Sequence, residues 1–389
     1  MPTMKKITTI CILILTSINI LAQSSETLSH TASWSETLEK AQKENKLIFV
    51  DCYFTGCHPC AQMDREVFPN AIVRDDLEKN FIAIKVDVFK EKLGDTLNLK
   101  YGVSGFPTFL VLNKDGRLIS MFVGYQDPAA LISKLSDAKA KAGRNEYMQG
   151  FAISNQLAYP DFYLGYYDRE DRKSDPAAAN KWIKAQNNWV DETVALPILR
   201  TGKLDIAVED YLLENYTTFI NYYGSALLIE KVSSILNARL KTSLGKQNDD
   251  QKFRQFLTGY SKSFPSQDWK IYNFLLGYTY YGSIAKDTTA LLRFMNEEPV
   301  VYMNYFGALY NNMVARKQLT DINLPLLASW VDKAVTENDS FDLLRTAASI
   351  HRMHNNTEGA RRFIMMALEK AKKFNMPVEG YEKQLSSLQ

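Results

Sequence analysis

Two cysteines separated by two residues, placed between an apolar run and a helical pattern, constrain this chain more than any other feature. The run Lys46–Phe54 is rich in β-branched and aromatic residues, which predicts a strand buried on both faces. Residues Cys60 to Glu66 then continue as a helix. Two thiols at this spacing can form a disulfide when the first, Cys57, opens the helix, where free N–H groups and the helix dipole favour a thiolate. This context therefore indicates thiol–disulfide exchange.

Residues on both sides of the motif resemble those of the thioredoxin-like family. Asp51 precedes Cys57 by six residues, the spacing of the buried aspartate in thioredoxins, and Lys85 falls where a lysine often pairs with that aspartate. The pair Phe106-Pro107 resembles the segment that contains the family's cis-proline. The resemblance covers roughly residues 30–140 and implies an α/β thioredoxin fold, a central mixed sheet flanked by helices.

The resemblance also implies a role for each residue of the motif. Cys57 would be the exposed nucleophile and Cys60 the buried resolving thiol, so that the pair alternates between a dithiol and a Cys57–Cys60 disulfide. Asp51 would accept the proton of Cys60, because burial raises the pKa of a carboxyl group, and Lys85 would tune that pKa.

The segment around the expected cis-proline implies a place for substrate. Pro107 would face the cysteines and would position the backbone of Phe106 to pair with an extended substrate segment. His58 stands where thioredoxins usually carry glycine, and it is either a stabiliser of the thiolate or a solvated loop residue. Gly56 replaces the tryptophan that usually precedes the first cysteine. The direction of redox exchange is therefore left open.

A structural zinc site is the main chemical alternative for the two cysteines. Such a site needs four ligands, and only Cys52 and the distant histidines His30, His351 and His354 remain after the leader peptide is excluded. We therefore expect no metal and no cofactor. Cys52 is expected to pack as a small apolar residue on the opposite face of the strand from Asp51. His351 and His354 are expected on a solvated helix face.

The first 23 residues resemble a signal peptide, with Lys5-Lys6 followed by an apolar stretch. Removing this segment takes away two lysines and leaves 44 basic and 44 acidic residues, a neutral balance that gives no reason to expect a nucleic-acid partner. We expect export, to the periplasm if the source is Gram-negative. A reductant in that compartment would need a membrane-bound electron donor.

The rest of the chain indicates a second, all-α domain. We predict a thioredoxin-like domain over residues 24–144 and a helical domain over 145–389, because apolar residues beyond 205 recur at intervals of three and four. The end of the chain resembles a tetratricopeptide-type helix pair, although no regular repeat runs through the rest. Asp175-Pro176 predicts the start of a helix that continues to about Val194 and is stopped by Pro197.

Two hypotheses of function follow. The first is an exported oxidoreductase of protein disulfides whose helical domain binds clients or partners. The second is a scaffold or chaperone-like binding protein in which the thioredoxin-like domain is mainly a docking module. The many Tyr and Phe residues of 259–310 are interpreted as a helix–helix core, with a peptide-binding groove as the alternative.

Overall fold

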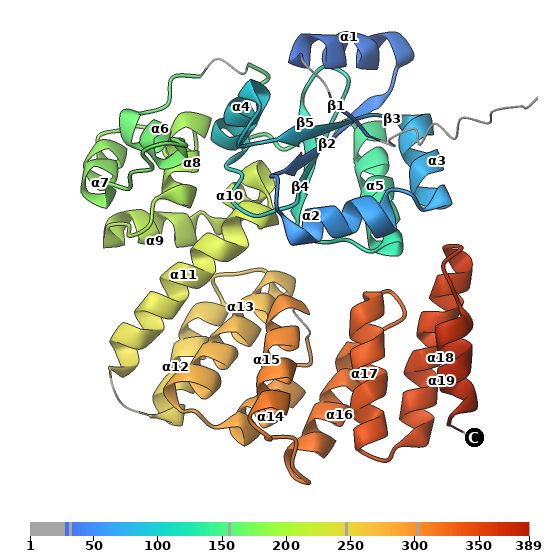
Figure 1. The fold of residues 1–389 in the computed structure, drawn as a ribbon. Coiled ribbons are helices and arrows are strands. Elements are labelled where there is room, and N and C mark those ends of the chain that lie inside the picture. Colours follow the sequence, from blue (N-terminus) through green and yellow to red (C-terminus); the bar gives the residue numbers. More distant parts are fainter. Residues whose placement is uncertain (1–27, 31–32, 155–156, 246–247, 301–302, 389) are drawn as a thin grey trace, which may run out of the picture.

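The computed structural model describes residues 28–388, apart from 31–32, 155–156, 246–247 and 301–302. The signal peptide predicted for residues 1–23 lies outside this range. An α/β part with a twisted sheet lies above a long succession of helices (Figure 1). This agrees with the fold class expected from the sequence, a thioredoxin-like domain followed by an all-helical region.

The sheet of the α/β part is mixed. Its five strands lie in the order β1 (Ser29–His30), β3 (Phe81–Asp87), β2 (Leu47–Tyr53), β4 (Thr108–Leu112) and β5 (Leu118–Val123). Strand β2 pairs parallel to β3 and antiparallel to β4, and β5 is the edge strand beyond β4. The register of β2 and β3 places Asp51 beside Lys85.

Helices cover both faces of this sheet. Helices α1 (Trp34–Glu44) and α4 (Lys92–Tyr101) pack on the face that carries Val50 and Cys52. The face that carries Phe49 is covered by four short or medium elements: α2 (His58–Gln62), the π-helical turn η1 (Met63–Val67), α3 (Ala71–Asn80) and α5 (Pro128–Gly143). Helix α5 begins at Pro128 because the Asp127 carboxylate caps it, accepting the Ala130 N–H at 2.8 Å.

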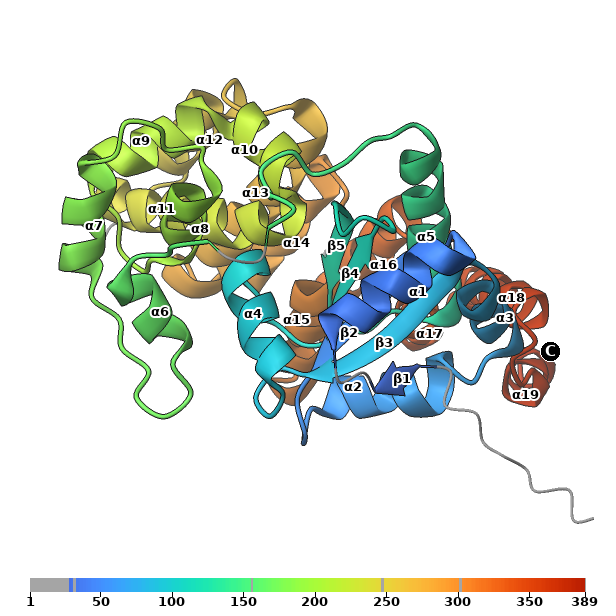
Figure 2. The same cartoon turned by 90° about the horizontal axis from the view of Figure 1, so that it is seen from above.

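The core beneath α4 continues without interruption into the helical region. Tyr101 packs against Phe151, which in turn packs against Tyr223, so the two parts of the chain share one apolar cluster. Figure 2 shows α4 between the sheet and the first helices of the second part. Those helices are α6 (Asp161–Tyr167), α7 (Pro176–Lys184), α8 (Glu192–Arg200), α9 (Ile206–Glu214) and α10 (Tyr216–Tyr223).

One helix boundary was predicted wrongly. The helix that opens at Pro176 ends at Lys184, and a separate helix, α8, contains Pro197 in its interior. Proline at this position removes one N–H group and therefore one possible hydrogen bond of the helix. Packing compensates for this loss, because six of the nine residues of α8 are apolar and buried: Val194, Ala195, Leu196, Pro197, Ile198 and Leu199.

The remaining helices form an arch that returns to the α/β part (Figure 1). At its far end, Lys370 forms a buried ion pair with Asp127 at 3.3 Å, and Asn70 Nδ2 donates to the carbonyl oxygen of Phe374 at 2.6 Å. The helices of the arch are α11 (Ser225–Leu244), α12 (Asp250–Ser261), α13 (Ser266–Thr279), η2 (Tyr280–Ile284), α14 (Thr288–Glu297), α15 (Met303–Ala315), α16 (Asn323–Ala334), α17 (Phe341–Met353), α18 (Thr357–Lys373) and α19 (Glu379–Ser386).

Many aromatic residues of the arch lie in its core, and others, such as Tyr260, Tyr278 and Tyr310, are partly buried against it. Tyr272, Phe274, Tyr280, Tyr281 and Phe306 are all buried between helices. This packing agrees with the helix–helix core expected from the sequence. None of the helices in the described ranges is both long and apolar enough to cross a membrane.

The expectation of a solvated face for the two histidines of α17 is wrong for His351. Its side chain is buried, its Nε2 lies 2.8 Å from Asp332 Oδ1, and its ring stacks on Phe363. Gly359 on α18 leaves the space that the ring occupies, because a Cβ there would lie 2.3 Å from His351 Nδ1. Burial lowers the pKa of His351, so the neutral imidazole is favoured.

Candidate active site

The Cys57–Cys60 pair lies where β2 leads into α2. The two sulfurs form a disulfide bond, and Cys57 is the N-cap residue of α2, where its sulfur accepts the Cys60 N–H at 3.2 Å. A negative charge at this position is favoured by the helix dipole and by the free N–H groups of the first turn. In this oxidised form Cys57 is 5% exposed, so the sulfur expected to be exposed is largely covered.

The structure shows the surroundings of His58, inside the motif, and of Gly56, directly before it. His58 is the first residue of α2, and its side chain is exposed. Gly56 has a backbone φ of 98°, which only glycine adopts without strain, so the turn into the motif favours glycine over the tryptophan usual in thioredoxins.

Asp51 is a completely buried carboxyl group on β2, and neither of its oxygens has a hydrogen-bond partner among the described residues. Its nearest cation is Lys85, whose Nζ lies 4.0 Å from Asp51 Oδ2. Burial raises the pKa of Asp51 to about 7, against the opposing effect of the Lys85 charge. A carboxyl group with this pKa can both take up and release a proton near neutral pH.

Asp64 belongs to the same charge cluster and was not anticipated from the sequence. Lys85 donates a hydrogen bond to Asp64 Oδ1, whereas it only approaches Asp51. The negative charge of Asp64 adds to the rise in the pKa of Asp51. Asp64 lies in η1, and the widened turns of a π-helix shift side-chain directions away from ordinary helical spacing. No local pattern around Asp64 therefore indicated this contact.

The Phe106–Pro107 peptide bond is cis. Pro107 directly precedes β4, and its carbonyl oxygen accepts the N–H of Gly124 at 2.8 Å. The Phe106 ring lies against Phe54 and Phe89, with ring centroids 5.1 and 5.6 Å away. Phe89 is 49% exposed, which gives this side of the site an apolar surface of three rings.

A residue of the helical region fixes the backbone of Phe89. Arg169 donates hydrogen bonds to the carbonyl oxygens of Phe89 and Glu91 and pairs with Asp95. The sequence indicated only a solvated charged loop around Arg169, because nothing local to it reveals a partner so distant in the chain. The helical region thus takes part in shaping the surroundings of the cysteine pair.

Cys52 follows Asp51 on β2 and faces the other side of the sheet. It is a buried free thiol within the core under α4, and burial raises its pKa well above the ordinary value. It therefore packs as a small apolar residue. Within the described ranges no three His, Cys, Asp or Glu side chains gather in a way that could hold a metal ion.

Comparison with known proteins places this site in a family. A thioredoxin-like domain family matches residues 34–139. Thioredoxin-1 of Drosophila melanogaster is 34% identical over 98 residues, which cover 25% of this chain and 80% of that protein. The chain belongs to the thioredoxin-like family. Its N-terminal part is therefore, at the level of the family, a thiol–disulfide oxidoreductase domain.

Other matches show how far the similarity extends. The solution structure of a proposed disulphide-isomerase from Bacteroides thetaiotaomicron is 34% identical, with a TM-score of 0.27, and the match covers 29% of this chain and 93% of that one. An uncharacterized protein of Caenorhabditis elegans is 34% identical over 85 residues, 21% of this chain. The chain spans only 12% of the length of that relative.

Proposed function

We propose that this protein is an exported thiol–disulfide oxidoreductase that acts on protein disulfides through Cys57 and Cys60. The observation that carries the proposal is the Cys57–Cys60 bond at the start of α2, on the strand that also carries the buried Asp51. The family assignment supports the same chemistry. Export and a membrane-bound electron donor are parts of the proposal that rest on the leader sequence alone.

In the reducing direction the reaction begins with the dithiol. The Cys57 thiolate attacks one sulfur of a client disulfide, a mixed disulfide forms, and the other client sulfur leaves as a thiolate that takes up a proton. Cys60 then gives its proton to Asp51 and attacks the Cys57 sulfur. This step releases the second client thiol and closes the Cys57–Cys60 bond, so one client disulfide is reduced while one dithiol is oxidised.

Asp51 suits the proton transfer because of its surroundings. An ordinary carboxyl group is fully ionised at neutral pH and is a weak base, whereas a group with a pKa of about 7 takes up a proton readily. The Lys85 charge keeps part of Asp51 ionised, which leaves it able to accept the proton of Cys60.

Reduction of insulin by dithiothreitol tests the proposal. We expect the wild-type protein to accelerate the precipitation of the insulin B chain and Cys57→Ser to abolish the acceleration. Cys52→Ser, which changes the buried thiol of the same strand, serves as the matched control and should retain activity. If wild type and Cys57→Ser are equally inactive while both bind client proteins, the scaffold function is the correct one.

A further inference from the structure

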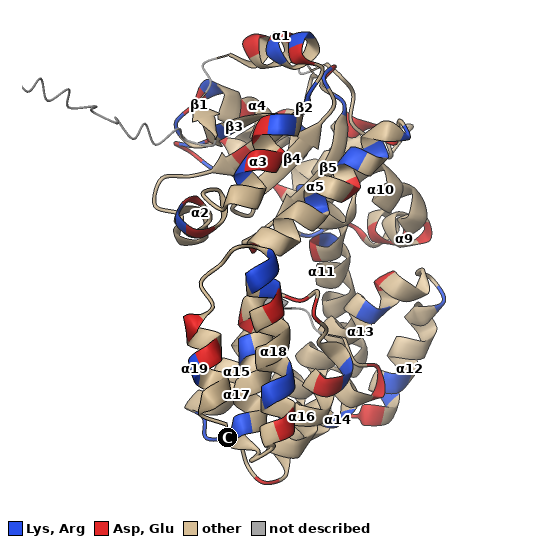
Figure 3. Cartoon of the chain, turned by 90° about the vertical axis from the view of Figure 1, so that its right-hand side faces the viewer, with Lys and Arg blue, Asp and Glu red and all other residues tan. Residues whose placement is uncertain are grey.

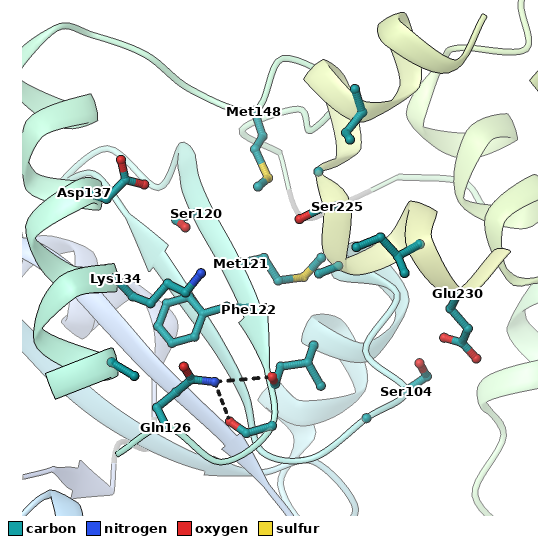
Figure 4. A pocket seen from close by; sticks show the side chains of 18 of the residues that line it. Ser104, Ser120, Met121, Phe122, Gln126, Lys134, Asp137, Met148, Ser225 and Glu230 are labelled. Carbon is teal, nitrogen blue, oxygen red and sulfur yellow. Dashed lines mark hydrogen bonds between the residues drawn. The ribbon is translucent and has the colours of Figure 1, made fainter. Parts of the chain in front are cut away.

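A cleft of about 2460 Å³ lies between the edge of the sheet and the helical arch, and we call it the β5–α11 cleft (Figure 4). Strand β5 forms its floor, and α5 and α11 form its two walls. One end of the cleft includes Gln62, Ser104 and Gly105. Gln62 follows Cys60 by two positions, and Gly105 precedes Pro107 by two. This end of the cleft is therefore formed by chain neighbours of the cysteine pair and of the cis-proline, although neither cysteine lines it.

The floor of the cleft is the outer edge of β5, which is paired at one end, where the Met148 N–H donates to the Leu118 carbonyl oxygen at 2.9 Å, and open around Met121. The Gly124 N–H donates to the Pro107 carbonyl oxygen, so Pro107 and Gly124 form a hydrogen-bonded pair of the β4–β5 ladder. Because such pairs alternate along antiparallel strands, Met121 and Val123 direct their N–H and C=O groups to the outer edge. The Gln126 amide contacts the Val123 carbonyl at 3.5 Å, as Figure 4 shows. No described residue pairs with the outward groups of Met121.

The α11 wall is uncharged except at Glu230, which pairs with Arg200 at 3.0 Å. Ser225, Ile229, Ser233 and Asn237 recur every four residues and lie on the helix face that lines the cleft. Side chains of this kind leave room for a bound polypeptide segment and do not select a particular sequence in it. Figure 3 shows Lys, Arg, Asp and Glu interspersed over the helices rather than gathered by sign, so no charge pattern selects a highly charged partner.

The cleft is held open by contacts that join the α/β part to the beginning and to the end of the helical region. On one side, the buried Lys100–Glu192 ion pair joins α4 to α8 at 3.1 Å. On the other, Asp127 at the start of α5 pairs with Lys370 and also accepts the N–H of Phe341 at 3.2 Å. A preformed site of this kind binds a flexible segment without the added cost of ordering its own walls.

We propose that the β5–α11 cleft binds an extended segment of the client polypeptide as an additional strand on β5. The Met121 N–H and C=O pair with the backbone of that segment, and the chain leaves the cleft past Val123 toward Cys57. Backbone pairing supplies affinity that is independent of sequence, which is the known advantage of strand addition. The client class is therefore unfolded polypeptide, and this inference rests on the function proposed above.

Binding of a thiol-blocked unfolded protein tests the inference apart from redox chemistry. The probe is fluorescently labelled, reduced and carboxymethylated α-lactalbumin, measured by fluorescence anisotropy with the full-length protein. Ser234, an exposed serine on the cleft face of α11, is replaced in Ser234→Trp, which narrows the cleft. Ser136→Trp is the matched control, because Ser136 is an exposed helical serine of α5 that does not line the cleft.

We expect wild type and Ser136→Trp to bind the probe alike and Ser234→Trp to bind it at least tenfold more weakly, with an unchanged thermal unfolding midpoint. Hydrogen exchange should show the Met121 amide protected only when the probe is bound. Equal binding by Ser234→Trp, no binding by wild type, or an amide of Met121 that exchanges equally fast with and without probe would each overturn the inference.

A protected Met121 amide in a concentration-dependent dimer would also overturn it, because a second copy would then fill the cleft. The proposed enzymatic function fails by a different result, an unchanged rate of insulin reduction in Cys57→Ser. The two failures are therefore distinguishable.

Discussion

Replacement of Asp51 by asparagine should change how the stability of this protein depends on pH. The Asp51 carboxyl has a pKa of about 7 in the folded protein and an ordinary value of 3.8. The native state therefore holds one more proton than the unfolded state between these two values. Because stability falls wherever the native state binds more protons, the wild type should lose stability as pH rises from about 4 to about 7.

The size of the loss follows from the pKa difference. A shift of about three pH units, at about 1.4 kcal/mol for each, gives a change of about 4 kcal/mol in the free energy of unfolding. Asp51 is completely buried, so solvent screening does not reduce this figure. Asp51→Asn has no group to ionise at this position, so its free energy of unfolding should lack this dependence on pH. Any cost of burying the new amide is the same at every pH and cancels when the two pH profiles are compared.

Guanidinium-induced unfolding of the oxidised proteins between pH 4 and pH 9 measures this difference. The free energy of unfolding of the wild type should fall by up to about 4 kcal/mol relative to that of Asp51→Asn between pH 4 and pH 8. Asp75→Asn, at a carboxylate that is 70% exposed, is the matched control and should follow the wild-type profile. Parallel profiles for wild type and Asp51→Asn would refute the argument from burial.

Three further substitutions have expected outcomes. Lys85→Met should raise the pKa of Asp51 further, because it removes the one charge that lowers it, and carbon NMR of the carboxyl group should show the later titration. Lys100→Met should cost about 3–5 kcal/mol in denaturant unfolding, since Glu192 stays buried without its cation; a loss under 1 kcal/mol would contradict this. Gly359→Ala should cost about 1–3 kcal/mol by thermal unfolding, because the new Cβ meets the buried imidazole of α17, whereas Gly380→Ala, in open space, should not.

The sequence was most informative where local pattern and the family resemblance agree. The apolar run before the cysteines predicted β2, and the register of β2 and β3 does bring Asp51 beside Lys85. A helical second part also followed from apolar spacing. These features depend on strand periodicity and on short-range order, which a single sequence displays directly.

Features that depend on packing between distant segments could not be predicted in the same way. The contact of Asp64 with Lys85 depends on a π-helical turn, and the hold of Arg169 on Phe89 joins residues 80 positions apart. His351 was expected on a solvated face because the sequence shows no carboxylate or third ligand near it, yet its side chain is buried and lies against Gly359 of α18. In each case tertiary packing decides a position that local pattern leaves open.

The central claim is that Cys57 attacks protein disulfides and Cys60 resolves the product. Trapping tests this most directly: reduced Cys60→Ser is mixed with disulfide-bonded insulin, and the products are analysed by non-reducing electrophoresis and mass spectrometry. The account predicts a stable mixed disulfide that joins Cys57 to an insulin chain and is absent from a Cys57→Ser/Cys60→Ser double variant. Absence of any adduct, or an adduct formed through Cys52, would contradict it.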